Sequence, residues 1–109
     1  MGDLLLSSPA VLGADDALGP GWVRLLEDGS VAEVGPGAPP GTPDLEVAYL
    51  TPAFVDIHCH GGGGSSFATT DPAEAEAAAS THRAHGTGSL IASLVTAPLD
   101  ELEAQVRAL

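Results

Sequence analysis

The chain has 109 residues, of which 44% are hydrophobic and 17% are charged. This length is less than one ordinary domain of about 150 residues, although it is enough for a small core. The apolar fraction excludes intrinsic disorder despite 14 Gly and 9 Pro. No run approaches the about 18–20 apolar residues of a membrane span, which excludes an integral membrane protein. Because the first residues lack the basic start of a secretory signal, a cytoplasmic protein is predicted.

The acidic balance excludes two classes of partner. The chain has 15 acidic and 3 basic residues, a net charge of -12, and no Lys. Nucleic acids and anionic lipid surfaces are bound mainly through clustered cations, so no nucleic-acid partner and no membrane partner is predicted. The scattered Arg24, Arg83 and Arg107 offer little to grip a phosphate. A single cysteine, Cys59, excludes an internal disulfide and fits a reducing compartment.

The first half of the chain reads as a small β unit of short strands joined by turns. The predicted strands cover residues 4–6, 22–27, 30–34 and 45–50. Asp28 and Gly29 form a residue pair that is typical of a type I′ hairpin turn. The prolines and glycines of residues 36–43 exclude both helix and central strand. Trp22 and Tyr49 are expected to pack in a core or an interface.

After Pro52 the pattern changes to alternating strands and helices. The predicted elements are a strand over residues 53–60, a helix over 73–84, a strand over 89–95 and a helix after Pro98. Asp71 is expected to be the N-cap of the first of these helices, and Pro72 its first residue. Gly86 is expected to end that helix. The last helix is expected to place its apolar residues on one face: Leu99, Leu102, Val106 and Leu109. Such alternation predicts parallel strands with crossover helices.

His58 and His60 are the sharpest chemical feature of the sequence. Side chains alternate along a strand, so these two imidazoles face the same way and can converge on one metal ion. Asp56 is expected on the same face of the strand, where it would support the two metal ligands without binding the metal itself. Cys59 is expected to point toward the covering helices with Val55 and Ile57. The alternative is two histidines near a loop with no metal.

The glycine run that follows has two interpretations. Gly61, Gly62 and Gly63 could form a loop that lets backbone approach a substrate closely, or a flexible connector. The run is not a nucleotide-binding loop, because no Gly-Lys-Ser/Thr follows and the spacing differs from Gly-x-Gly-x-x-Gly. Its place after an apolar strand suits the active-site end of a parallel barrel. His82 and His85 are assigned a structural role in the last turn of a helix, far from that end.

The residues from Pro52 through the glycine run resemble the first-strand motif of the amidohydrolase superfamily. The glycines after His60 and the later run from His82 to Leu90 are similar, more narrowly, to N-acetylglucosamine-6-phosphate deacetylases. Ala53 stands where that family usually has Gly, and Gly88 where Thr is common. The likeness extends over nearly the whole chain, because the N-terminal hairpin resembles the small β domain of that family.

The resemblance implies a metal-dependent deacetylase of amino-sugar phosphates built on a (β/α)8 barrel with a split β-sandwich. Residues 1–51 correspond to the first strands of the sandwich, and residues 52–109 to the first two βα units of the barrel. His58 and His60 correspond to metal ligands, with zinc as the first choice and iron or another divalent ion as alternatives. One or two ions per complete subunit and a full-length homodimer are implied. The remaining ligands, the catalytic Asp and the sugar-phosphate contacts of the family lie beyond Leu109.

The sequence therefore assigns no catalytic residue within this segment. The chain is expected to be the truncated, inactive and loosely folded N-terminal part of a product of roughly 40 kDa, and the native mass would test this. Two other interpretations stay open. The chain could belong to another amidohydrolase, such as an N-acetylgalactosamine-6-phosphate deacetylase or a cyclic-amide hydrolase. It could also be a noncatalytic remnant.

Overall fold

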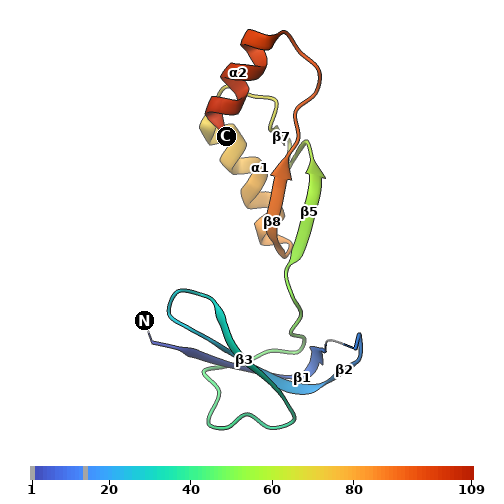
Figure 1. Cartoon of the computed structure of the whole chain (residues 1–109), viewed down its shortest axis with the longest axis vertical. Helices are drawn as coiled ribbons and strands as arrows, with labels where there is room; N and C mark the ends of the chain where they lie inside the picture. Colours follow the sequence, from blue (N-terminus) through green and yellow to red (C-terminus); the bar gives the residue numbers. More distant parts are fainter. Residues whose placement is uncertain (1, 14) are drawn as a thin grey trace. The chain divides into compact units, whose positions relative to one another are not determined.

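The structure is a computed structural model that describes residues 2–13 and 15–109. The chain divides into two compact units, Met1–Pro52 and Ala53–Leu109. Each unit contains its own sheet, and each is described below by itself. The first unit is made of strands, whereas the second contains both strands and helices (Figure 1).

The first unit is built on a four-stranded sheet in the order β3-β2-β1-β4 (Figure 1). Its strands are β1 (Leu4–Leu12), β2 (Leu18–Leu25), β3 (Val31–Pro36) and β4 (Leu45–Glu46). β2 pairs antiparallel with both β1 and β3, while β4 pairs parallel with β1. The predicted β unit is thus present.

Strand β1 is longer than the sequence indicated, and β4 is shorter. The chain stays extended beyond residue 6 through Ser8 and Pro9, with a register irregularity between Ser8 and Val11. Proline is tolerated in a strand at such an irregularity, where no ladder hydrogen bond is required from it. The backbone N–H of Ala10 donates to the Ser8 hydroxyl over 3.0 Å instead. Because residues 7–9 are two serines and a proline, the sequence did not indicate the last two thirds of this strand.

The expected hairpin between β2 and β3 is present, but its turn type was predicted wrongly. Gly29 has a φ of 83°, and Asp28 is not among the residues with positive φ. A type I′ turn needs positive φ at both central positions. Gly29 N–H donates to the Leu26 carbonyl over 2.9 Å, and Leu26 N–H donates to the Ser30 carbonyl over 2.9 Å. The turn is therefore type I with a left-handed glycine after it, which adds one residue to the loop.

The Asp28 carboxylate at this turn accepts two hydrogen bonds from Ser30. The Ser30 hydroxyl donates to Asp28 Oδ1 over 2.6 Å, and the Ser30 backbone N–H donates over 2.9 Å. The hydroxyl bond is the larger cause, and together they hold the pKa of Asp28 below its ordinary value. Ser30→Ala removes the hydroxyl only, so we expect the Asp28 pKa to rise part of the way back. Carboxyl chemical shifts followed against pH would measure it.

Ser80→Ala is the matched control for this titration. The Ser80 hydroxyl donates to Glu76 Oε1 over 2.9 Å, and this bond is the main cause of the lowered pKa of Glu76. The control should raise the Glu76 pKa and leave that of Asp28 unchanged. An Asp28 pKa that stays in place in Ser30→Ala would show that the hydroxyl does not stabilise this carboxylate.

The second unit contains a parallel pair of strands and two helices. Strands β5 (Phe54–Cys59) and β8 (Thr87–Ala92) pair in parallel, and helix α1 (Pro72–Ala84) connects them. Helix α2 (Leu99–Ala108) follows β8 (Figure 1). The predicted order of strand, helix, strand and helix, and the parallel pairing, are confirmed.

Helix α1 begins and ends where the sequence indicated. The Asp71 carboxylate accepts a hydrogen bond from the Ala73 N–H over 2.9 Å, which satisfies one of the free donors of the first turn. Pro72 occupies the start, where its missing N–H costs nothing. Gly86, with a φ of 95°, lies just after the helix and takes a conformation that other residues disfavour. Local chemistry is therefore sufficient to define this helix.

The core of the second unit lies between β5 and α1, but the expected face of β5 is only partly correct. Cys59 is buried with Phe67, Ala75 and Ala78, as expected for its side of the strand. Val55 and Ile57 are instead 71% and 73% exposed. The pairing of β5 with β8 is irregular between Asp56 and Cys59, where β5 has one extra residue. This irregularity breaks the alternation, so Cys59 no longer shares a face with Val55 and Ile57.

Three further packing predictions have mixed outcomes. Trp22 is buried at 8% exposure and lies against Gly35, where a Cβ would overlap its ring. Tyr49 is 71% exposed and does not enter the core. In α2 the predicted apolar face is open, with Leu99 80% exposed, whereas Gln105 is buried at 4%.

Candidate metal site at the end of strand β5

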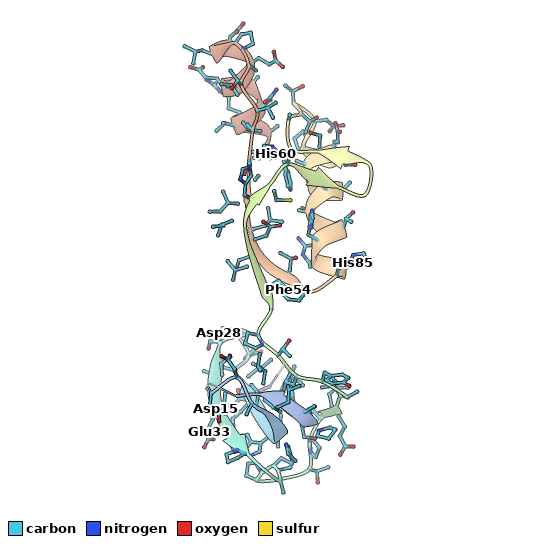
Figure 2. The ribbon with its side chains drawn as sticks, turned by 90° about the vertical axis from the view of Figure 1, so that its right-hand side faces the viewer. Asp15, Asp28, Glu33, Phe54, His60 and His85 are labelled. Atoms are coloured by element: carbon cyan, nitrogen blue, oxygen red, sulfur yellow. The ribbon has the colours of Figure 1, made fainter. Side chains whose placement is uncertain are left out.

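The two histidines of the His-x-His motif meet at the carboxyl end of β5. His58 is in the strand and His60 directly follows it, and both side chains are exposed. Their Nε2 atoms lie 2.9 Å apart, with the ring centroids 4.9 Å apart and the planes at 61°. Figure 2 shows His60 at this end of the strand, opposite to Phe54 at its start. The local fold thus brings together the two nitrogens that the motif supplies.

The spacing of the two nitrogens fits a shared metal ion. With zinc–nitrogen bonds of about 2.0–2.1 Å, nitrogens at this separation subtend about 90° at the ion. Such an angle leaves other coordination positions free for further ligands. The metal-free alternative also has a definite form, because the same 2.9 Å is a hydrogen bond between one protonated and one unprotonated ring nitrogen. The geometry is compatible with both states.

Asp56 does not lie where alternation placed it. Its carboxylate lies on the side of β5 that carries Cys59 and faces His82 of α1. One potential metal-binding atom from each of these three residues lies within 4.8 Å of the other two. The extra residue in β5 explains the difference, since it changes the side on which the following residues emerge. Asp56 Oδ1 accepts a hydrogen bond from the backbone N–H of His58 over 3.0 Å. It therefore supports the backbone of His58, and a role behind a bound metal stays a prediction.

The glycine run forms a tight turn and is not a loose connector. Strands β6 (Gly61–Gly62) and β7 (Ser65–Ser66) pair antiparallel. The two residues between them, Gly63 and Gly64, have φ angles of 62° and 84°. Positive φ at both central positions of a two-residue loop is the type I′ arrangement, for which glycine is favoured. This turn holds the backbone immediately after His60 in one conformation.

Close contact with α1 is the second reason for the glycines. A Cβ at Gly62 would lie 2.7 Å from His82 Nε2, and one at Gly63 would overlap Thr81 Oγ1. The His82 Nε2 atom also lies 2.9 Å from the Gly61 carbonyl oxygen. The prediction that the helix keeps His82 far from this end of the strand is therefore wrong. Substrate contact by Gly61, Gly62 and Gly63 stays a prediction.

Two residues that the sequence left in minor roles also hold this region. Glu74 Oε1 accepts from the Ser66 N–H over 3.1 Å, and Glu74 Oε2 accepts from the Thr69 hydroxyl over 2.7 Å. His85 Nδ1 lies 2.8 Å from the Thr81 carbonyl oxygen, which fits its predicted structural role. Glu74 occupies the third helical position, where a carboxylate is typical of helix capping, so its position in the sequence did not indicate these contacts.

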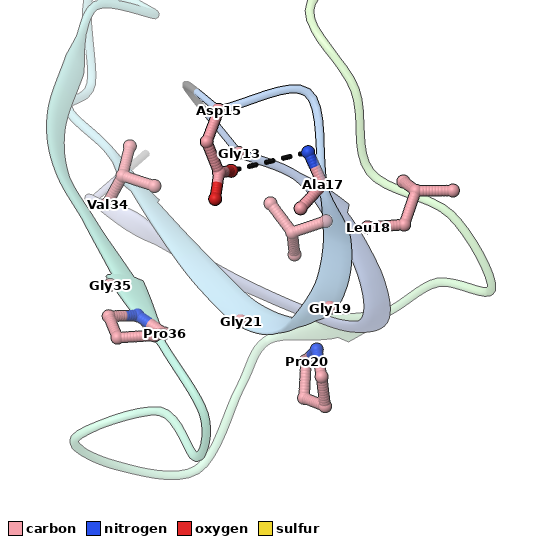
Figure 3. Close-up of a pocket in the computed structure, with 11 residues that line it drawn as sticks. Gly13, Asp15, Ala17, Leu18, Gly19, Pro20, Gly21, Val34, Gly35 and Pro36 are labelled. Carbon is pink, nitrogen blue, oxygen red and sulfur yellow. Dashed lines mark hydrogen bonds between the residues drawn. The ribbon is translucent and has the colours of Figure 1, made fainter.

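A pocket in the first unit offers no comparable chemistry. It has a volume of about 310 Å³ and a mainly apolar lining that includes Val11, Leu18 and Val34 (Figure 3). Its charged residue, Asp15, accepts a hydrogen bond from the Ala17 N–H over 3.3 Å. That bond stabilises the local turn, and no residue singled out in the sequence lines the pocket.

Comparison with known proteins shows which solved structures the chain is similar to. A structure of a variant N-acetyl-D-glucosamine-6-phosphate deacetylase from Mycobacterium smegmatis, in complex with N-acetyl-D-glucosamine-6-phosphate, is 41% identical, with a TM-score of 0.86 over 99% of this chain. A second structure of that deacetylase is 42% identical, with a TM-score of 0.82 over 96% of this chain. This chain resembles the N-terminal part of such a deacetylase. The predicted α/β class and the predicted family resemblance are confirmed.

The resemblance to the deacetylases covers only part of those proteins. The chain spans 29% and 30% of the two Mycobacterium smegmatis chains. It is also 30% identical over 82 residues to the N-acetylgalactosamine-6-phosphate deacetylase of Escherichia coli O157:H7, covering 75% of this chain and 22% of that protein. No family model matches the chain. Within the described residues, no helix has the length and apolar character to cross a membrane.

Proposed function

We propose that this chain is the first part of a metal-dependent deacetylase that hydrolyses the acetamide of N-acetylglucosamine 6-phosphate. The products are glucosamine 6-phosphate and acetate, as part of amino-sugar catabolism. The observation that carries the proposal is the convergence of His58 Nε2 and His60 Nε2 at the end of β5. The identity of 41% over nearly the whole chain to a deacetylase solved with that sugar phosphate supports it.

In this proposal His58 and His60 hold a divalent metal ion through Nε2. Zinc is the first choice, because imidazole is a common zinc ligand, with iron or another divalent ion as alternatives. A bound divalent ion polarises a carbonyl group and lowers the pKa of water. Asp56 fixes the backbone of His58 by accepting its N–H. The turn of Gly61, Gly62 and Gly63 fixes the backbone after His60 and is proposed to border the substrate.

In this proposal the residue that transfers the proton belongs to a part of the whole protein that these 109 residues do not include. Residues 1–51 are proposed to be the first strands of a small β-sandwich, and residues 52–109 the first two βα units of a (β/α)8 barrel. The chain spans under a third of the length of the deacetylases it resembles, so one or two metal ions, a homodimer and a cytoplasmic location are proposed for the whole protein. The 109-residue chain alone is expected to release no acetate.

A second candidate substrate is N-acetylgalactosamine 6-phosphate. The similarity to the Escherichia coli N-acetylgalactosamine-6-phosphate deacetylase is the observation that favours it, at 30% identity. The two sugars differ in the configuration of one hydroxyl group. A site that hydrogen-bonds a hydroxyl rejects an analogue that cannot make the bond. Both sugar phosphates therefore belong in the same assay.

The test is acetate release by the natural product of the gene that encodes this chain. We expect release from N-acetylglucosamine 6-phosphate, and a double variant, His58→Gln with His60→Gln, that lowers kcat/KM by about 100-fold or more. Loss of groups that merely orient ligands already costs about 10–100-fold. His85→Gln is the matched control, because the described hydrogen bond of the His85 side chain goes to the Thr81 carbonyl and to neither His58 nor His60, so this variant should keep full activity. An unchanged rate in the double variant would show that this pair does not hold the metal.

A further inference from the structure

A second group of metal-binding atoms lies on the α1 side of β5. One ligand atom each of Asp56, Cys59 and His82 lies within 4.8 Å of the others. Cys59 Sγ is 3.1 Å from His82 Nε2, which is 2.9 Å from the Gly61 carbonyl oxygen. Cys59 Sγ is 3.6 Å from that same oxygen. Four potential metal-binding groups thus lie close together: the Cys59 sulfur, the His82 imidazole nitrogen, the Asp56 carboxylate and the Gly61 carbonyl oxygen.

The surroundings of this group suit a cation. Cys59 is 5% exposed, and Asp56 and His82 are half-buried, so the donor atoms are shielded from bulk water on several sides. Each of the three arginines in the chain is instead ion-paired with a glutamate, through Arg24–Glu33, Arg83–Glu76 and Arg107–Glu103. None of these side chains neutralises the Asp56 carboxylate, and a divalent ion would do so.

We propose that Asp56, Cys59 and His82 form a binding site for a borderline divalent metal ion such as Zn²⁺, separate from His58 and His60. Thiolate and imidazole ligands select zinc or cobalt over magnesium and calcium. With bonds of about 2.0–2.3 Å, ligand atoms in a tetrahedral zinc site lie about 3.3–3.7 Å apart. The distance from Cys59 Sγ to the Gly61 oxygen, 3.6 Å, lies in this range, and the distances of 3.1 Å and 2.9 Å from these two atoms to His82 Nε2 fall below it by a few tenths of an ångström. The Asp56 ligand atom lies within 4.8 Å of those of Cys59 and His82, so a movement of about 1 Å brings it into the range.

Binding changes two bonds in this cluster. The Cys59 thiol releases its proton to water as the sulfur–metal bond forms, so the site gains a net charge of one unit. The neutral His82 ring binds through Nε2, so the proton that Nε2 donates to the Gly61 oxygen is lost to water while Nδ1 takes one up, and the contact with that oxygen is given up. That oxygen is then free to serve as the fourth ligand. The site links β5, the glycine turn and α1, so the bound ion ties together three elements.

Cobalt titration of the metal-free protein tests the proposal, because Co²⁺ replaces zinc and bonds to thiolate give a charge-transfer absorption in the near ultraviolet. We expect this absorption in the unaltered protein and in the variant His58→Gln with His60→Gln. Cys59→Ser should abolish it, and His82→Gln should weaken Co²⁺ binding by at least tenfold. His85→Gln, which changes a neighbouring histidine outside the cluster, should bind as the unaltered protein does.

A second readout protects the test against variants that fail to fold. Zn²⁺ should slow the alkylation of Cys59 by N-ethylmaleimide in the unaltered protein and in His85→Gln, and should not slow it in Asp56→Asn with His82→Gln. Absence of a thiolate absorption with Co²⁺, together with alkylation that Zn²⁺ does not change, would overturn the proposal. The contact of Cys59 with His82 would then be a hydrogen bond that only fastens the helix to the glycine turn.

Discussion

Replacing Phe67 by alanine is expected to cost the second unit about 3–5 kcal/mol in the free energy of unfolding. Phe67 is 2% exposed and is the largest fully buried side chain in the described part of the chain. It packs with Cys59, Ala75 and Ala78, which are all small and cannot close the cavity left behind. Domains are stable by only about 5–15 kcal/mol, so the loss would be a large fraction of the stability of this unit. Urea unfolding followed by circular dichroism would measure it.

Phe54→Ala is the control that separates burial from loss of an aromatic ring. Phe54 belongs to the same unit but is 67% exposed, and its ring lies 3.6 Å from the place that a Cβ at Gly86 would occupy. Its replacement should change the free energy of unfolding by less than about 1 kcal/mol. Equal losses in the two variants would contradict the assignment of Phe67 to the core. The Phe67 N–H also donates to the His60 carbonyl over 3.0 Å, so unfolding here would displace the candidate metal site.

Elements with strong local signals could be predicted from the sequence. Asp71, Pro72 and Gly86 fix both ends of α1 through bonds and backbone conformations that involve only their neighbours. The position of the β2–β3 hairpin was equally local, because Gly29 can adopt positive φ at low cost. The turn type was not predictable in this way. It depends on the register of the two strands, which is set over their whole length.

The faces of β5 were predicted from the alternation of Val55, Ile57 and Cys59 with Asp56, His58 and His60, and the prediction was confirmed only in part. Alternation places side chains correctly only where the strand has no irregularity. The irregularity between Asp56 and Cys59 then moved Cys59 relative to Val55 and Ile57. A one-residue irregularity leaves no mark in composition or spacing. It is visible only once β8 is paired with β5.

The candidate site shows the same division between local and distant information. The meeting of His58 and His60 follows from two positions on one short segment, and the sequence predicted it. The contact of His82 with Gly61 joins residues 21 positions apart, and it depends on how α1 packs back on the sheet. The position of His82 in the last turn of a helix expected outside a barrel favoured a structural role. The reason for the glycine run was therefore hidden until the packing was known.

Gly63→Ala is expected to destabilise the second unit more than Gly64→Ala does. Both residues have positive φ, at 62° and 84°, so each alanine carries a backbone cost of about 1–2 kcal/mol. A Cβ at Gly64 meets nothing within 4 Å, whereas one at Gly63 overlaps Thr81 Oγ1. Forcing a group into an occupied space adds about 1–3 kcal/mol. The difference between the two urea midpoints therefore isolates the contact between the turn and α1.

Combining Gly63→Ala with Thr81→Ala tests whether the overlap with Thr81 causes the extra loss. The second substitution removes the overlapping hydroxyl, which donates to the Ala77 carbonyl over 3.0 Å, and leaves the backbone of the turn unchanged. In the double variant, the Gly63→Ala loss should shrink toward that of Gly64→Ala, because the overlap with Thr81 Oγ1 is gone and the nearest remaining atom, the Cβ of residue 81, is 3.2 Å away. Strictly additive losses would mean that the turn does not rest on α1. Helix α1 would then not help to position His60. The glycine turn directly follows His60, and it reaches the helix only through its contacts with Thr81 and His82.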